Sequence, residues 1–376
     1  MLEVAKTLHD ELDVLSSLDN IRNAVHLINN LIVRIDFGKD FEQQLTLYVE
    51  CRAMFPRLKQ VLECLVYAVC NLAMKTCHIM KNGHTKKTAS FVRACLAYCH
   101  ITIPSITDTF TRLTLLILCS EVGIRNHSLP QTDTFLKAAI STILDIPETI
   151  VQEERKRVHS EERVAGYVRQ MLSLLVVVPG HPDIGPFYLI QGLLGALPQF
   201  HWQPSTGVQT RLYMDIISLL CTLSQQNLPY RIPFVTSNDE LYGGAAAYQK
   251  ELRRLLRTVL DDIVAQMTGI TKLIATHNGS GNSGTNNQFK LQYVLVRVAV
   301  DLCCLLVDRM SLDDQSCIKF ITGLLNLANR NGLNTNDRRV IRNAAMFISN
   351  RMSNDKLKAV LHSSESLLAA ISACLK

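Results

Sequence analysis

The chain has 376 residues, of which 48% are hydrophobic and 19% are charged, and its formal net charge is +6. This composition excludes wholesale disorder, because it supplies ample apolar material for a continuous core. It also argues against nucleic-acid binding, since the dispersed basic clusters lack interleaved aromatic residues and accompany no known motif.

The N-terminus shows no sign of a targeting segment. Its first residues alternate charged and apolar side chains and contain no hydrophobic stretch of signal-peptide length. The run Leu172 to Val178 comes nearest to a membrane span, and it is far shorter than the roughly 18 to 20 residues that a span needs. We therefore expect a soluble protein that faces the cytosol.

A helical stripe from Ile21 to Ile35 leads into a predicted helix hairpin, Asp36 to Met80. Gly38 breaks the first helix, and Asp40 with Gln43 three residues later is typical of an N-cap and capping box. Pro56 then ends one helix and presets the first turn of the next. Two antiparallel helices are therefore expected on either side of Pro56.

The next predicted helices are separated by glycine, proline and polar turns. One helix is expected from Thr85 to just before Pro104, a second from about Thr107 to Val122, and a third from Leu129 to just before Pro147. A fourth carries Met171 and ends near Val178. Two more are expected over Phe187 to Leu197 and Leu212 to Leu223. The charged run Gln152 to Arg163 is either a polar connection or the exposed start of a helix. No stretch of useful length alternates like a half-buried strand.

Two later stretches interrupt the helical pattern. Helical periodicity disappears between Asn227 and Tyr248, and a connection of this length is usually a functional insertion or a disordered loop. After a helix from about Ala247 towards Ala275, residues 279–287 read as a flexible Gly/Ser/Asn linker. Further helices are expected around Leu291 to Leu305, Ile318 to Ala328, Asp337 to Met352 and Leu357 to Ile371.

These elements predict an all-α fold, a HEAT-like helical-hairpin solenoid. About fourteen helices follow one another through short turns, and helix pairs recur at roughly the 40 to 50 residues of HEAT-like repeats. The predicted organisation is a solenoid over 1–278 with a non-helical insertion near 227–248, the linker 279–287, and C-terminal solenoid helices over 288–376. Two all-α domains divided near residues 278 to 287 are the structural alternative.

The 12 cysteines lie mostly in apolar helical stretches, and no Cys-x-x-Cys occurs. Buried free thiols in a reducing compartment are therefore favoured over a disulfide framework or a metal site. The nearest approach to a metal cluster is Cys77, His78, Cys95, Cys99 and His100, of which Cys95 and Cys99 are one helical turn apart. Their apolar neighbours favour core packing, and we predict no metal and no cofactor.

No catalytic motif is recognisable. The chain has no phosphate-binding loop, dinucleotide fingerprint, His-Glu-x-x-His or nucleophile elbow, so we predict that it is not an enzyme. Trp202, the only tryptophan, would be either a binding anchor or, more commonly, a cover over an apolar helix junction. His181, in a Pro-Gly-His-Pro turn, is expected to hydrogen-bond the turn or face solvent.

Several long strings are specific enough to indicate a family. They are Asp36 to Leu45 with Tyr48-Val49-Glu50, Lys87 to Cys95 with Ala97 to Cys99 and Ile101 to Ser105, and Ser237-Asn238-Asp239 with Leu241 to Gly244. Together they resemble the large scaffold subunit of the retriever complex, a paralogue of the retromer α-solenoid scaffold. The agreement is dense from about Gly38 to Ser141, patchy to Gly244 and weak beyond.

The resemblance implies a non-enzymatic, endosome-associated cytoplasmic scaffold that recycles cargo from endosomes to the cell surface. In that family the solenoid holds an arrestin-fold subunit near its N-terminal part and wraps a metallophosphoesterase-fold subunit with its C-terminal part. Coiled-coil and COMM-domain proteins join them, and membrane association is peripheral, through partners. This chain begins roughly where the family's C-terminal portion begins, so we expect the arrestin-fold site to be absent from it.

We accordingly predict binding of the metallophosphoesterase-fold subunit by helices after Tyr213. The candidate partner-binding residues are Asp239, Leu241, Tyr242, Leu302 and Leu325. One alternative is a membrane-surface helical-repeat adaptor that uses its basic clusters on anionic lipid. Another, an α-helical enzyme, would need a convergent polar pocket.

Overall fold

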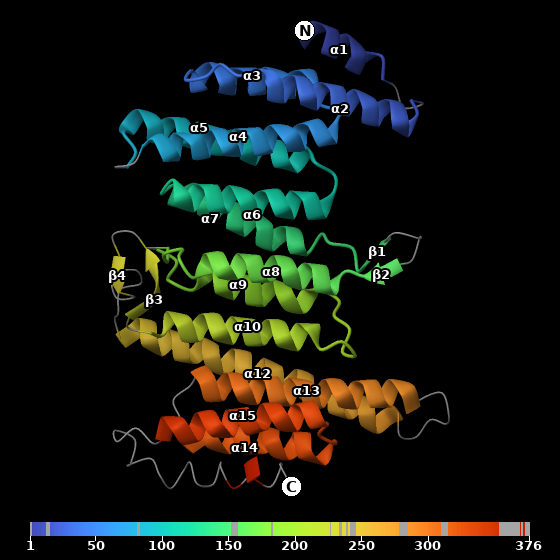
Figure 1. Ribbon diagram of the computed structural model, residues 1–376, viewed down its shortest axis with the longest axis vertical. Helices are drawn as coiled ribbons and strands as arrows, with labels where there is room; N and C mark the ends of the chain where they lie inside the picture. The colour runs from blue at the N-terminus through green and yellow to red at the C-terminus, as the bar shows by residue number, and fades with distance from the viewer. Residues whose placement is uncertain are drawn as a thin grey trace. The chain divides into compact units, whose positions relative to one another are not determined.

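The computed structural model describes residues 2–12, 16–80, 83–151, 157–181, 183–225, 227–232, 235–237, 240, 246–277, 285–309, 315–352, 369 and 371–372. Over these residues the chain consists of antiparallel helix pairs with two short β-hairpins (Figure 1). The predicted all-α class is therefore confirmed. None of the described helices combines the length and apolarity needed to cross a membrane.

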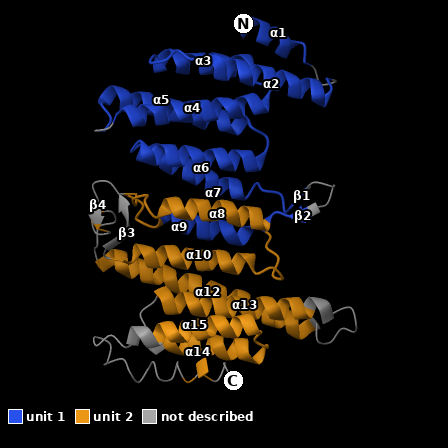
Figure 2. Cartoon of the chain, in the orientation of Figure 1, with its two compact units in different colours: residues 1–160, 188–200 blue, residues 161–187, 201–376 orange. Residues whose placement is uncertain are grey.

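The chain divides into two compact units, and neither unit is one continuous stretch (Figure 2). Unit 1 comprises residues 1–160 and 188–200, and unit 2 comprises residues 161–187 and 201–376. The polypeptide thus leaves unit 1 at Ser160, returns to it at Tyr188 and leaves it again after Phe200.

Unit 1 is built from consecutive helices that pair with their neighbours along the chain. Its α-helices are α1 (Leu2–Asp10), α2 (Leu18–Arg34), α3 (Phe41–Met54), α4 (Lys59–Ile79), α5 (Lys86–Thr102), α6 (Thr109–Arg125), α7 (Leu129–Ile143) and α9 (Tyr188–Ala196). Short 3-10 turns, Ile103–Ser105 and Leu197–Gln199, follow α5 and α9. The main pairs are α4 with α5 and α6 with α7, and α4 also packs against α6.

Polar caps set where several of these helices begin. The side chains of Ser17, Asp40, Thr85 and Asp108 each accept a hydrogen bond from a backbone N–H three residues later, which satisfies an otherwise unpaired donor of the first turn. The helix hairpin expected around Pro56 is present, because α3 ends at Met54 and α4 begins at Lys59.

The charged run after α7 forms a β-hairpin, which corrects the expectation that the chain has no strands. Strand β1 (Thr149–Val151) pairs antiparallel with β2 (Arg157–His159). Ser160, fully buried, closes the base of the hairpin: its Oγ donates to the carbonyl oxygen of Pro147 at 2.6 Å. Strands of three residues are too short for an alternating pattern to be legible in the sequence.

Unit 2 contains the two longest described helices, α12 (Ala246–His277) and α13 (Thr285–Arg309). Its other described α-helices are α8 (Glu161–Leu175), α10 (Val208–Leu223), α14 (Gln315–Arg330) and α15 (Thr335–Met352). Helix α10 packs against α8, α12 and α13, and α13 packs against α12, α14 and α15. Close approach of α10 and α13 depends on Gly207, whose φ is +67° and whose missing Cβ leaves room for Val294.

Two predicted irregular segments of unit 2 are only partly described. Within 227–248, β3 (Asn227–Ile232) pairs antiparallel with β4 (Val235–Ser237), which again corrects the expectation of no strands. Helix α13 begins at Thr285, so the last three residues of the predicted linker are helical. Residues 279–284 lie outside the described residues, and α12 and α13 on either side of them belong to the same unit.

Candidate functional site

The predicted partner-binding residues do not gather on one described surface. Asp239, Leu241 and Tyr242 lie outside the described residues. Leu302 on α13 and Leu325 on α14 are 0% and 1% exposed. These two leucines are core residues of unit 2, where α13 and α14 pack together; the chain itself covers the apolar faces that we expected a partner to cover.

Large apolar side chains are nevertheless exposed on the last helices of unit 2. Phe289 and Tyr293 on α13 are 70% and 57% exposed, and α15 exposes Met346 and Phe347. Phe289 and Tyr293 are four residues apart, which places them on the same face of the helix. Among the described aromatic residues, these two leave the most surface open to a partner. The sequence alone did not single them out, because Phe289 and Tyr293 have the same four-residue spacing as the buried Leu291 and Leu295 of the same helix.

Trp202 and His181 are structural. Trp202 is only 9% exposed, which matches the role of covering a helix junction and not that of an exposed anchor. His181 Nδ1 accepts hydrogen bonds from the backbone N–H groups of Asp183 and Ile184, at 3.1 and 3.3 Å. The histidine therefore holds its own turn.

A cleft of about 820 Å³ opens in unit 1 among residues of α2, the α2–α3 connection, α3 and α4. Its wall is mostly apolar, and the charged or titratable residues along it include Asp36 and His78. Asp36 accepts the N–H of Gly38 at 2.8 Å, and His78 Nδ1 is 2.8 Å from the carbonyl oxygen of Met74. Both side chains contact the nearby backbone, and they do not form an acid–base pair with each other. The wall of the cleft is therefore mainly an apolar surface.

The residues considered for a metal site are not brought together. Cys77 Sγ donates to the carbonyl oxygen of Arg125 at 3.4 Å, and the ring of His100 packs edge-on against Phe135 at 5.7 Å. Only Cys99 of that set enters a thiol cluster. Its partners are Cys70 and Cys119, which lie far from it in the sequence.

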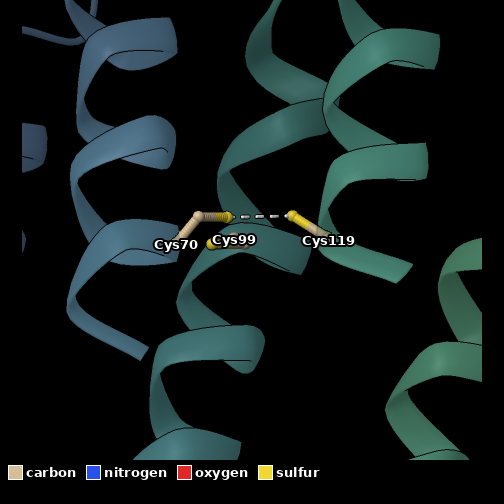
Figure 3. A group of neighbouring side chains, drawn as sticks. All are labelled: Cys70, Cys99 and Cys119. Carbon is tan, nitrogen blue, oxygen red and sulfur yellow. Dashed lines mark hydrogen bonds between the residues drawn. The ribbon is translucent and has the colours of Figure 1, made fainter. Parts of the chain in front are cut away.

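Cys70, Cys99 and Cys119, here called the thiol triad, come from three different helices, α4, α5 and α6 (Figure 3). All three are buried, and their sulfur atoms lie within 4.8 Å of one another. The Sγ atoms of Cys70 and Cys119 are 3.7 Å apart and share a hydrogen bond. The pairing of α4 with α5 and with α6 in the helix array produces this arrangement.

The three thiols of the triad do not titrate alike. Hydrogen bonds from Cys119 and Cys99 lower the pKa of Cys70. Hydrogen bonding within the triad, together with burial, raises the pKa of Cys99 and that of Cys119. Cys95, one turn before Cys99, is also buried, and burial followed by the charge of Cys70 raises its pKa to about 12.

Over the described residues, the fold is that of an all-α helical-repeat protein built from paired helices. The family model for the VPS35L C-terminal domain matches residues 1–368. The chain belongs to this family, which confirms the resemblance found in the sequence.

Curated relatives agree with the family match. The chain is 40% identical over 270 residues to the zebrafish protein "VPS35 endosomal protein-sorting factor-like", and 42% identical over 264 residues to the Dictyostelium discoideum protein of the corresponding name. The human relative is 40% identical over 272 residues. These alignments cover 70–72% of this chain and 26–28% of the relatives, so the chain spans about a quarter of their length.

Proposed function

We propose that this chain is a non-catalytic scaffold in endosomal protein sorting. On this proposal it acts at the cytoplasmic side of endosomes in a retriever-type assembly, and supports the return of cargo to the plasma membrane. The observation that carries the proposal is the family match over residues 1–368, together with relatives that are named as endosomal protein-sorting factors.

The proposed principal partner is a metallophosphoesterase-fold subunit, held by helices that follow Tyr213. Support comes from the exposed aromatic side chains Phe289 and Tyr293 on α13, one of these helices. Exposed aromatic residues commonly supply most of the affinity of a protein interface, because they bury a large area at a low cost in conformational entropy. An arrestin-fold subunit and coiled-coil and COMM-domain proteins would complete the assembly.

The test is a quantitative pull-down of the phosphoesterase-fold subunit by the full chain. We compare the unchanged chain with a Phe289→Ala, Tyr293→Ala double variant, which should bind at least about tenfold more weakly if these residues anchor the partner. Leu27→Ala is the matched control, because Leu27 is 59% exposed but lies on α2 in unit 1.

Three outcomes separate the parts of the proposal. No binding by the unchanged chain would contradict the choice of partner. Equal binding by the double variant would place the interface elsewhere on the chain. Weaker binding by Leu27→Ala than by the double variant would move the interface to unit 1.

A further inference from the structure

The thiol triad is a preorganised set of soft ligands. Each cysteine sits inside a helix, so its backbone is fixed, and each is at most 2% exposed. The three helices pack against one another, and their buried side chains include Leu65, Leu96 and Leu113. Bringing three sulfur atoms together therefore requires no rearrangement of a loop, and this feature is independent of the proposed scaffold function.

The sulfur spacing fits a metal ion better than a disulfide. A disulfide needs its sulfur atoms about 2.05 Å apart, far closer than the 3.7 Å between Cys70 and Cys119. Three sulfur atoms arranged in a plane around one ion, with metal–sulfur bonds of about 2.3 Å, would be about 4.0 Å apart. The triad, with one separation of 3.7 Å and all three within 4.8 Å, brackets this value.

We propose that Cys70, Cys99 and Cys119 form a binding site for one soft d10 metal cation, monovalent copper. Thiolate ligands select soft cations such as Cu(I), and copper(I) accepts three sulfur ligands in a plane. Zinc in structural sites takes four ligands, and the triad supplies three within bonding range. The distinction between the two ions thus follows from the number of sulfur atoms.

Copper binding at the triad is coupled to proton release. When Cu(I) binds, the three thiols release their protons to solvent and the three sulfur atoms form bonds to copper, because the thiolate and not the thiol is the metal ligand.

The experiment uses the full chain, reduced and handled without oxygen. Cu(I) is offered as its complex with a chelator that changes colour on losing copper, and Zn²⁺ is offered in a parallel arm. The copper retained after gel filtration should be about one ion per chain. Cys70→Ala and Cys119→Ala should each lower the affinity for copper at least tenfold.

Cys51→Ala is the matched control, because Cys51 is also fully buried in unit 1 but lies outside the triad. It should retain copper like the unchanged chain. Equal copper retention by Cys70→Ala and Cys51→Ala would overturn the proposal, as would an unchanged chain that retains no copper. Preferential retention of zinc would overturn the choice of ion.

A second measurement avoids the risk that a core variant misfolds. X-ray absorption at the copper edge of the loaded, unchanged chain should show about three sulfur neighbours near 2.3 Å. Nitrogen or oxygen neighbours in their place would overturn the site. Copper should also raise the thermal midpoint of the unchanged chain, because a ligand that binds only the folded state stabilises it.

Discussion

At the scale of single residues, the burial of thiols makes the stability of unit 1 sensitive to alkaline pH. Burial, with a smaller effect of Glu50, raises the pKa of Cys51 from 9.0 to about 11. Between these values the unfolded chain loses a proton that the folded chain keeps. The stabilising contribution is therefore complete below pH 9 and is lost as the pH rises through about 11.

We expect the free energy of unfolding to fall by up to about 1.4 kcal/mol per pH unit in this range because of Cys51 alone. The check is urea unfolding at about pH 8 and about pH 10, with Cys51→Ala for comparison. The variant should start less stable but lose less stability between the two pH values. An equal loss in both proteins would show that Cys51 is not responsible.

Gly123 on α6 lies against Thr132 on α7. A Cβ added there would overlap Oγ1 of Thr132. This hydroxyl donates to the carbonyl oxygen of Ser128 at 3.2 Å, so turning it away would break that hydrogen bond. We expect Gly123→Ala to lower the free energy of unfolding by about 1–3 kcal/mol. Gly166→Ala in α8 meets no atom within 4 Å and should be neutral or stabilising by up to about 1 kcal/mol.

The double variant Gly123→Ala, Thr132→Ala tests this cause directly. Because it removes the obstructing hydroxyl, it should be less destabilised than the sum of the two single variants. Strict additivity, measured by denaturant unfolding of all four proteins, would assign the cost to something other than the overlap.

The burial of the cysteines could be predicted from the sequence, but their convergence in space could not. That Cys70, Cys99 and Cys119 are buried follows from their apolar neighbours, and the structure confirms it. Their convergence depends on contacts between α4, α5 and α6, and Cys70 and Cys119 are separated by 49 residues. No local spacing encodes such a contact, so sequence reasoning chose the wrong companions for Cys99.

At the scale of an element, the start of α3 depends on two residues, four positions apart, that have different roles. Asp40 caps the helix by accepting the N–H of Gln43 at 3.0 Å. Gln44 is 5% exposed; its amide donates to the carbonyl oxygen of Ile35 and accepts the N–H of Phe37, both at 3.0 Å. Gln44 therefore fastens the α2–α3 connection to the helix.

We expect Gln44→Ala to lower the free energy of unfolding by about 1–3 kcal/mol, because it leaves two backbone groups without their partner. Asp40→Ala should cost about 1 kcal/mol, the usual cost of losing a cap. The exposed neighbour Gln43 is the control, and its replacement by alanine should change stability by less than about 0.5 kcal/mol. Equal effects of Gln43→Ala and Gln44→Ala in urea titrations would contradict the role given to Gln44.

Helix starts and breaks were the features that could be predicted best from the sequence. The N-cap at Asp40 and the break at Pro56 were predictable because each rests on interactions within a few residues. The bridge made by Gln44 was not, since it spans nine residues to Ile35 and nothing in the sequence distinguishes Gln44 from Gln43. The short hairpin of β1 and β2 was missed because three-residue strands carry no usable period.

At the scale of the whole molecule, the exposed basic clusters predict weak, salt-dependent binding to anionic membranes. Arg253, Arg254 and Arg257 are exposed on α12, and Arg254 is paired with Glu251 at 2.6 Å. Each arginine near an anionic surface contributes about 1 kcal/mol, and salt screens the attraction. We expect sedimentation with phosphatidylserine vesicles at about 10 mM salt and little or none at about 150 mM.

An Arg253→Glu, Arg257→Glu variant should lose the binding seen at low salt. Strong sedimentation at about 150 mM salt that this variant abolishes would favour the membrane-surface adaptor over the scaffold. Sedimentation at both salt concentrations that the variant leaves unchanged would point to a different surface of the chain.

The all-α class was predictable at this scale because helix formation is decided by local periodicity and caps. The partition into units was not, because it depends on which distant helices pack together. The exposed aromatic residues of α13 were likewise invisible in the sequence, where Phe289 and Tyr293 look like the core residues Leu291 and Leu295 beside them.

The interleaving of the two units bears on how the protein is made. Residues 188–200 complete unit 1, whereas residues 161–187 belong to unit 2. As the ribosome extends the chain, α8 therefore emerges before the last helix of unit 1. Until Phe200 leaves the exit tunnel, the surface of α7 that packs against α9 has no cover. A nascent chain of this length therefore exposes an apolar surface to which chaperones can bind, and this surface is buried in the complete fold.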